Sequence, residues 1–121
     1  MKKKKTLIIG ASTNPERYSY KAAHRLSNAG HPIVNIGLRS GVVAGETILP
    51  PGSPTEDVDT VTLYIGPALQ PQYYDSILAL RPNRVIFNPG TENPEFIKKL
   101  TDAEIEPVIA CTLVMLSTGE F

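Results

Sequence analysis

The sequence predicts an α/β protein with a three-layer Rossmann-like fold, built on a mostly parallel sheet of about five strands. Short apolar, β-branched segments alternate along the chain with segments whose apolar residues recur at helical spacing. Most of these segments are separated by Gly, Pro or Asn, which favour turns. The spacing from the first strand through a helix to the second strand suits a right-handed crossover, which makes the paired strands parallel.

The first three elements form one strand-helix-strand unit. A strand is expected over residues 6–9, because this stretch is short, apolar and β-branched. Gly10 follows where the backbone must turn, and a helix is expected over 19–29, where apolar residues recur at i, i+3 and i+4. Gly30 ends this helix, and the second strand lies within 32–37.

The remaining elements continue the same alternation. A glycine-rich loop covers residues 39–54 and leaves room for a short strand at 46–49. Asn93 is the expected N-cap of a following helix, because its side-chain oxygen can accept a hydrogen bond from a free backbone N–H. Further strands are expected at 59–65, 84–88 and 108–110, and further helices at 69–80, 94–103 and 112–117.

Length and composition indicate one domain over residues 1–121, with a basic N-terminal tail at 1–5. Twelve basic and twelve acidic side chains balance, so we expect neither a nucleic-acid partner nor an anionic membrane. The single Cys111 excludes an internal disulfide framework and favours the cytoplasm. The apolar stretch after the basic run is too short for a signal peptide, and no segment reaches transmembrane length.

Four loops should meet at the carboxyl ends of the strands, where open parallel sheets bind their ligands. These loops cover residues 10–20, 37–45, 66–70 and 88–93. The first joins a strand, a glycine turn and a helix N-terminus, whose unpaired N–H groups and dipole favour an anion. We therefore expect this loop to hold the phosphates of a nucleotide, with the Ser12 hydroxyl as a further donor.

The first loop departs from the glycine fingerprint of NAD-binding proteins. Its third and sixth positions hold Ser12 and Pro15 instead of glycine. The second strand ends near Asn35 and is followed by Arg39, with no acidic side chain to take the ribose 2′-hydroxyl. An uncharged strand end followed by an arginine favours a ribose with its own phosphate, as in coenzyme A or NADP.

Gly10-Ala11-Ser12 with Pro15, followed by Ser19-Tyr20 at the helix start, resembles the motif of the small CoA-binding proteins. Those are stand-alone Rossmann domains similar to the nucleotide domain of the succinyl-CoA synthetase alpha subunit. The resemblance covers nearly the whole chain. The sequence departs from the family pattern at the end of the second strand, in the loop after Asn88, and in Ile109-Ala110, where relatives have Asp-Arg before the cysteine.

The resemblance implies contacts to each part of CoA. The first loop and the helix start would hold the pyrophosphate, and the second strand and its loop would face the ribose and its phosphate. The third loop would line the path of the adenine or the pantetheine, and the fourth would lie near the pantetheine arm. The implied residues are, in that order, Gly10, Ala11, Ser12, Ser19 and Tyr20; Asn35 and Arg39; Ile65 and Gly66; Asn88, Pro89 and Gly90.

Few residues offer chemistry beyond binding. His24 lies within a helix and His31 in a helix-to-strand turn, without a partner at catalytic or metal-ligand spacing. Cys111 follows the last strand, at the end where the loops meet. A buried structural thiol is the simpler interpretation of Cys111, and a mixed disulfide with the CoA thiol is the alternative. We therefore expect no catalytic residue and no metal site.

The function expected from the sequence is non-catalytic binding of CoA or an acyl-CoA. One alternative is a small NADP-dependent oxidoreductase, for which 121 residues leave little room for a substrate pocket. Another is an interaction module that keeps the fold without a ligand. The expected partner is a nucleotide-type small molecule, and the apolar residues 114–116 leave a homodimer open.

Overall fold

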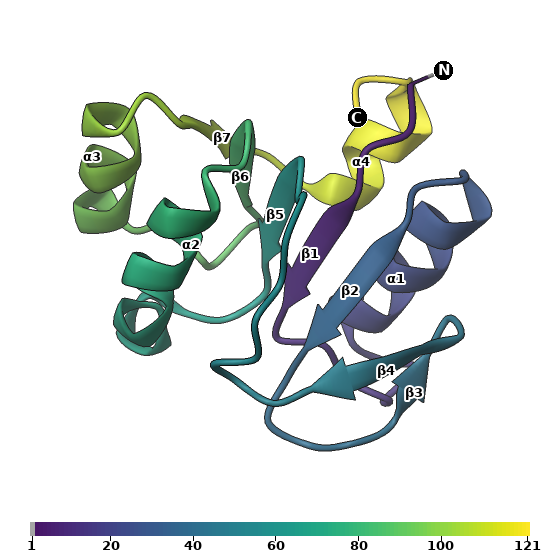
Figure 1. Cartoon of the computed structure of the whole chain (residues 1–121). Helices are drawn as coiled ribbons and strands as arrows, with labels where there is room; N and C mark the ends of the chain where they lie inside the picture. The colour runs from purple at the N-terminus through teal and green to yellow at the C-terminus, as the bar shows by residue number, and fades with distance from the viewer. Residues whose placement is uncertain (1) are drawn as a thin grey trace.

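The computed structural model describes residues 2–121 and places a seven-stranded sheet between two layers of helices (Figure 1). The strand order is β3-β4-β2-β1-β5-β6-β7, and every neighbouring pair except β3–β4 is parallel. This confirms the predicted three-layer Rossmann-like fold. The strands are β1 (Thr6–Ile9), β2 (Ile33–Ile36), β3 (Val42–Val43), β4 (Glu46–Leu49), β5 (Thr60–Leu63), β6 (Arg84–Phe87) and β7 (Glu106–Ile109). The helices are α1 (Tyr18–Asn28), α2 (Tyr74–Leu80), α3 (Pro94–Asp102) and α4 (Thr112–Thr118).

The sheet has more strands than the five predicted, because residues 42–49 form a hairpin. β4 is the short strand anticipated at 46–49, and it pairs in parallel with β2. β3 runs back along β4 through a two-residue turn at Ala44 and Gly45, which have φ values of 53° and 82°. Two consecutive positive φ values are typical of a type I′ hairpin turn. A two-residue strand is too short to carry a hydrophobic period, so the sequence pattern did not reveal β3.

The helix predicted over 69–80 is shorter and is preceded by two 3₁₀ turns, Pro67–Leu69 and Pro71–Tyr73. Proline has no N–H for an α-helical hydrogen bond but suits the first position of a turn, and each of these turns begins with one. α3 begins as predicted, because the Asn93 side chain accepts a hydrogen bond from the Phe96 N–H at 3.3 Å.

Apolar side chains fill both faces of the sheet. Because successive strand residues point to opposite faces, Ile9 and Phe87 pack on the side of α2 and α3. Ile8 and Ile86 pack on the side of α1 and α4 (Figure 1). Near-continuous burial of β1 and β5 is typical of parallel strands covered on both faces.

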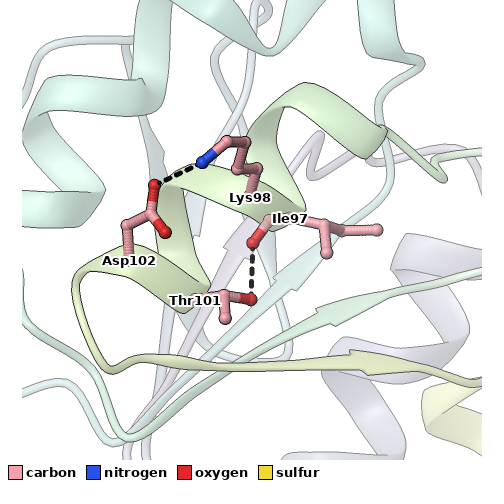
Figure 2. A network of polar contacts seen from close by, with 4 residues as sticks. All are labelled: Ile97, Lys98, Thr101 and Asp102. Carbon is pink, nitrogen blue, oxygen red and sulfur yellow. Dashed lines mark hydrogen bonds and ion pairs between the residues drawn. The ribbon is translucent and has the colours of Figure 1, made fainter.

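The outer face of α3 carries a local polar network (Figure 2). Lys98 Nζ lies 2.9 Å from Asp102 Oδ2, and the Thr101 hydroxyl donates to the Ile97 carbonyl at 2.9 Å. The two charged side chains are 77% and 65% exposed, and such helix pairs contribute about 0.3–0.5 kcal/mol. The position of α3 therefore depends mainly on its buried side, where Phe96 is fully enclosed.

The amino-terminal ends of the strands are closed by contacts between the two ends of the chain. The Lys4 N–H donates to His31 Nδ1 at 3.0 Å, and the His31 ring packs against Phe121 with 4.9 Å between centroids. The Phe121 carbonyl accepts hydrogen bonds from Arg84 Nη2 at 2.7 Å and from Lys4 Nζ. Lys4, which belongs to the basic run near the N-terminus, is thus part of this cluster.

His31 is buried in this cluster, and its Nε2 has no hydrogen-bond partner among residues 2–121. Burial lowers the pKa of His31, and the positive charges of Lys4 and Arg84 lower it further, against a smaller opposite effect of Asp59. The folded protein therefore takes up a proton at His31 only at a lower pH than the unfolded chain, whose imidazole has a pKa of about 6.5.

Stability is expected to fall as the pH drops below about 6.5, because the unfolded state then binds more protons than the folded state. Urea unfolding at about pH 7.5 and about pH 5.5 measures this difference. The parent should lose more stability over this interval than His31→Gln, while His24→Gln should behave as the parent does. Equal losses in the parent and in His31→Gln would contradict this assignment.

Candidate functional site

The first loop leaves β1 at Gly10 and crosses the end of β5. Gly10 has a φ of +94°, a region that side chains rarely adopt. A Cβ at this position would lie 3.0 Å from Ile65 Cγ2 and 3.1 Å from the Tyr64 carbonyl oxygen. Glycine therefore allows the first loop to pass directly against the residues that follow β5.

The loop after β2 meets the same loop from the other side. A Cβ at Gly37 would lie 2.4 Å from the Ala11 carbonyl oxygen, so the two backbones are in direct contact. A Cβ at Gly41 would lie 2.5 Å from Thr13 Cγ2. The loops after β1, β2 and β5 are therefore packed together at the carboxyl ends of the strands.

The amides at the start of the first loop are used within the protein. The N–H groups of Gly10 and Ala11 both donate to the Ile36 carbonyl, at 2.9 Å each. Within residues 2–121, the amides of Ser12 and Thr13 have no acceptor. The backbone donors that an anion can use on this side of the loop therefore begin at Ser12.

The other end of the loop supplies the first turn of α1. Arg17 occupies the N-cap position, and no side chain caps the helix. The first N–H groups of a helix have no carbonyl partner within it. Here these groups belong to Tyr18, Ser19 and Tyr20.

Side chains of the loop hold its turn without occupying those helix amides. Ser12 Oγ accepts from the Asn14 N–H at 3.0 Å, and Asn14 Oδ1 accepts from the Glu16 N–H at 3.0 Å. The Ser12 hydroxyl proton remains available as a donor. Ser12 therefore stabilises the turn of the first loop and does not cap α1.

Ser19 and Tyr20 face the body of the protein. Ser19 is buried, and the Tyr20 ring packs against His24 with 4.6 Å between centroids. Tyr18 is different, since it is 67% exposed at the mouth of the loop. Lys21 Nζ lies 5.4 Å from the centre of the Tyr18 ring.

Asn35 and Arg39 have different surroundings. Asn35 is fully buried, and its Nδ2 donates to the carbonyls of Val43 at 3.1 Å and Glu46 at 3.2 Å. Its side chain therefore fixes the β3–β4 hairpin. Arg39 is exposed and makes no hydrogen bond or ion pair within residues 2–121, which leaves its guanidinium available to a ligand.

The loop after β5 is tied to the loop after β6 by Gln70, whose role was not predicted from the sequence. Gln70 is fully buried, and its Nε2 donates to the carbonyls of Ile65 at 3.0 Å and Thr91 at 2.7 Å. Its Oε1 accepts from Asn93 Nδ2 at 2.9 Å. Gly66 lies beside Ile65 in open space, where a Cβ would meet nothing within 4 Å.

Asn88 connects three elements at the end of β6. Its Nδ2 donates to Thr62 Oγ1 at 2.7 Å and to the Leu63 carbonyl at 2.8 Å, and its Oδ1 accepts from the Thr112 N–H at 2.8 Å. All of its polar atoms are thus bonded within the protein. Pro89 and Gly90 follow it on the surface.

A cavity of about 200 Å³ opens beside Asn88. It is lined by Tyr18, Tyr64, Asn88, Pro89, Cys111 and Leu113. Cys111 is a free, half-buried thiol. Burial raises the pKa of Tyr64 to about 12, and the buried hydroxyl has no hydrogen-bond partner within residues 2–121. The nearby hydroxyls of Thr62 and Thr112 bond to each other at 2.8 Å.

A larger cavity of about 440 Å³ lies on the side of α2. Its walls come from Ile9 and Ile36, which end β1 and β2, from the loop 52–57, and from one side of α2. Because Gly10 and Gly37 directly follow these two strand ends, this cavity adjoins the packed loops. The two cavities therefore flank the ends of the central strands on opposite faces of the sheet.

The described part of the chain was not found to contain a metal centre or a membrane-spanning helix. Residues 2–121 contain no group of three or more His, Cys, Asp or Glu side chains placed to hold a metal ion. None of the helices in this range combines the length and apolarity needed to cross a membrane. The candidate site is the edge formed by the packed loops and the two cavities.

Comparisons with known proteins identify the family. Solved structures similar to this chain include an uncharacterized protein with 53% identity, full coverage of both chains and a TM-score of 0.96. A Thermus thermophilus protein and a hypothetical protein from Pyrococcus horikoshii OT3 each have 25% identity and a TM-score of 0.85. The alignment covers 98% of this chain and 91% of the Thermus protein, and 97% of this chain and 84% of the Pyrococcus protein.

Among curated proteins, none matches the chain. The family described as "CoA binding domain" matches residues 4–117, which is nearly the whole chain. The match includes every loop of the carboxyl edge described above. The chain therefore belongs to the family of CoA-binding domains, as its first loop and helix start suggested.

Proposed function

We propose that this protein binds coenzyme A at the carboxyl edge of its sheet and does not catalyse a reaction of it. The family supports CoA as the ligand. The main support for this site is that backbone amides at both ends of the first loop have no acceptor within the protein. These amides belong to Ser12 and Thr13 at one end and to the first turn of α1 at the other. Such amides and the helix dipole favour a pyrophosphate, and the Ser12 hydroxyl adds a donor.

The order of the strands suggests how CoA lies across this loop. β2 and Arg39 are on one side of β1, and β5 and β6 are on the other. In CoA the phosphorylated ribose and the pantetheine arm extend in opposite directions from the pyrophosphate. We place the ribose phosphate on Arg39 and the adenine in the larger cavity, which Ile9 and Ile36 line.

The pantetheine arm then passes over Ile65 and Gly66 toward Pro89 and Gly90. In this arrangement Gly10 and Ala11 shape the turn, since Ile36 occupies their amides. Asn88 likewise acts by holding the wall of the site, because its polar atoms are bonded within the protein. Asn35 fixes the hairpin beside Arg39, and Ser19 and Tyr20 contribute their amides.

The proposal of binding without catalysis rests on the residues that line the two cavities. No histidine lies among them. The amides of Asn88 and Gln70, which approach the pantetheine path, are fully engaged in the protein's own bonds. A nucleophile or base needs a partner that orients it, and no side chain-to-side chain hydrogen bond within residues 2–121 joins two lining residues of either cavity, which supports the proposal.

Arg39→Ala is expected to weaken CoA binding by about tenfold to a hundredfold, because a charge-assisted hydrogen bond contributes about 1.5–3 kcal/mol. Isothermal titration measures this with CoA and with dephospho-CoA, which lacks the 3′-phosphate. Dephospho-CoA should bind the parent and Arg39→Ala equally. Arg25→Ala is the matched control, since Arg25 is exposed in the last turn of α1, at the far end of the helix from the loop.

Each outcome of this titration decides one part of the proposal. If Arg39→Ala binds CoA with unchanged affinity, CoA remains the ligand, but its ribose phosphate does not bind to Arg39. Tighter binding of NADP than of CoA would favour the oxidoreductase instead. Absence of binding to CoA, dephospho-CoA and NADP would contradict the proposed function and favour an interaction module.

A further inference from the structure

The smaller cavity, beside Asn88, lies at the carboxyl edge of the sheet. Building on the proposed function, we infer that this cavity receives the acyl group of an acyl-CoA whose acyl chain is short and uncharged. The protein would then discriminate among CoA thioesters by the length and charge of their acyl ends.

The position of the cavity suits the reactive end of CoA. Its walls come from the start of α1, from the residues after β5 and β6, and from the start of α4. All of these segments lie at the carboxyl edge, on the β6 side of the first loop. Pro89 belongs both to this wall and to the proposed path of the pantetheine arm. A group attached to the CoA sulfur is therefore delivered to the mouth of this cavity.

The lining favours an apolar group. Tyr18, Tyr64, Pro89, Cys111 and Leu113 line the cavity together with Asn88, and most of its surface is apolar. The polar atoms of Asn88 are already bonded to Thr62, Leu63 and Thr112. The Tyr64 hydroxyl is buried against the Thr62–Thr112 pair and stays neutral, since its pKa is raised to about 12.

The lining also disfavours a charged acyl end. Lysine, arginine and histidine are absent from the residues that form the cavity. A carboxylate placed there would lose its hydration without a basic partner among the lining residues, which is costly in an apolar environment. The acyl group of a dicarboxylic acid, such as succinyl, should therefore bind less well than a saturated acyl group of the same length.

The volume limits the length of the chain. A water molecule takes up about 30 Å³ of the liquid, so about 200 Å³ has room for roughly six or seven such volumes. Pockets that hold a whole drug-sized ligand measure about 300–1,000 Å³. The cavity can thus enclose a thioester with an acyl group of about two to four carbons, whereas a long chain would extend into solvent.

Titration of the parent protein with a series of CoA thioesters tests this inference. With a reductant present, so that Cys111 forms no disulfide, the probes are CoA and its acetyl, butyryl, succinyl and dodecanoyl thioesters. Affinity should rise about fourfold for each methylene from acetyl to butyryl, the value for transfer of a buried CH₂ group out of water. Succinyl-CoA should bind at least about tenfold more weakly than butyryl-CoA, and dodecanoyl-CoA no more tightly than butyryl-CoA.

Leu113→Trp should fill the cavity and remove the preference for butyryl-CoA over CoA, while CoA itself still binds. Val114→Trp is the matched control, because Val114 is the next residue on α4 and is 56% exposed outside the cavity lining. This control should keep the preference. The chain-length series on the parent remains decisive if Leu113→Trp does not fold.

The results separate this inference from the proposed function. Equal affinities for CoA and butyryl-CoA, or affinity that keeps rising to dodecanoyl-CoA as in surface adsorption, would overturn the inference and leave CoA binding intact. A preference that persists in a folded Leu113→Trp would also overturn it. Failure of every CoA compound to bind would contradict the proposed function itself.

Discussion

Gly37→Ala is expected to destabilise the protein by about 2–3 kcal/mol and to weaken CoA binding by more than about a hundredfold. The added Cβ would lie 2.4 Å from the Ala11 carbonyl oxygen, a backbone atom that cannot rotate away. Relief of this overlap requires the first loop to move as a whole. That movement displaces the free amides of Ser12 and Thr13, so stability and binding should be lost together.

Gly66→Ala is the control for the stability part of this prediction. Gly66 follows β5 at the same edge, its φ is −68°, and a Cβ there would meet nothing within 4 Å. Its free energy of unfolding should stay within about 0.5 kcal/mol of the parent value. Urea unfolding and CoA titration of both variants test the pair, and equal stability of the two would show that the first loop yields easily to Gly37→Ala.

Asn88→Ala is expected to lower the free energy of unfolding by about 3 kcal/mol. The substitution leaves the Leu63 carbonyl and the Thr112 N–H without their partners in the interior, and it opens a void between β5, β6 and α4. For a chain of this size, the change corresponds to a decrease in Tm of about 10 °C. Thermal unfolding followed by circular dichroism measures it.

Asn83→Ala provides the comparison, because Asn83 lies just before β6 at the opposite end of the same strand. Its Nδ2 donates to Asp59 Oδ2 at 2.8 Å on an exposed surface, where water can replace the lost group. The loss in stability should be under about 1 kcal/mol. Similar losses for both variants would mean that Asn88 does not connect the three elements tightly.

The layers and the parallel core of this protein were predictable from local pattern. Apolar runs such as Thr6–Ile9, and apolar residues at helical spacing between Tyr18 and Asn28, carry the periods of a buried strand and of a helix. β3 was not predicted, because two residues are too few to show the alternation of apolar and polar side chains that marks a strand. α2 is shorter than predicted because Pro67 and Pro71 each begin a 3₁₀ turn before it. The sequence alone did not show where the α-helix begins, because this depends on how the loop after β5 packs.

The candidate site was less predictable, because its features depend on contacts between distant segments. The resemblance placed Gly10 and Ala11 on the pyrophosphate, but the sequence could not show that Ile36 accepts both of their amides. Gln70 looked like an ordinary loop residue, since its partners Ile65 and Thr91 are brought to it only by the fold. Likewise His31 lies in a turn by sequence and is buried by Lys4 and Phe121.

The outermost strands of the sheet bear on how copies of this protein can meet. β3 offers only two residues at one edge, and β7 carries Pro107, which has no N–H to donate, at the other. Short edge strands and edge prolines are poor templates for adding a foreign strand. Both borders are therefore poor sites for edge-to-edge strand pairing between copies of this protein.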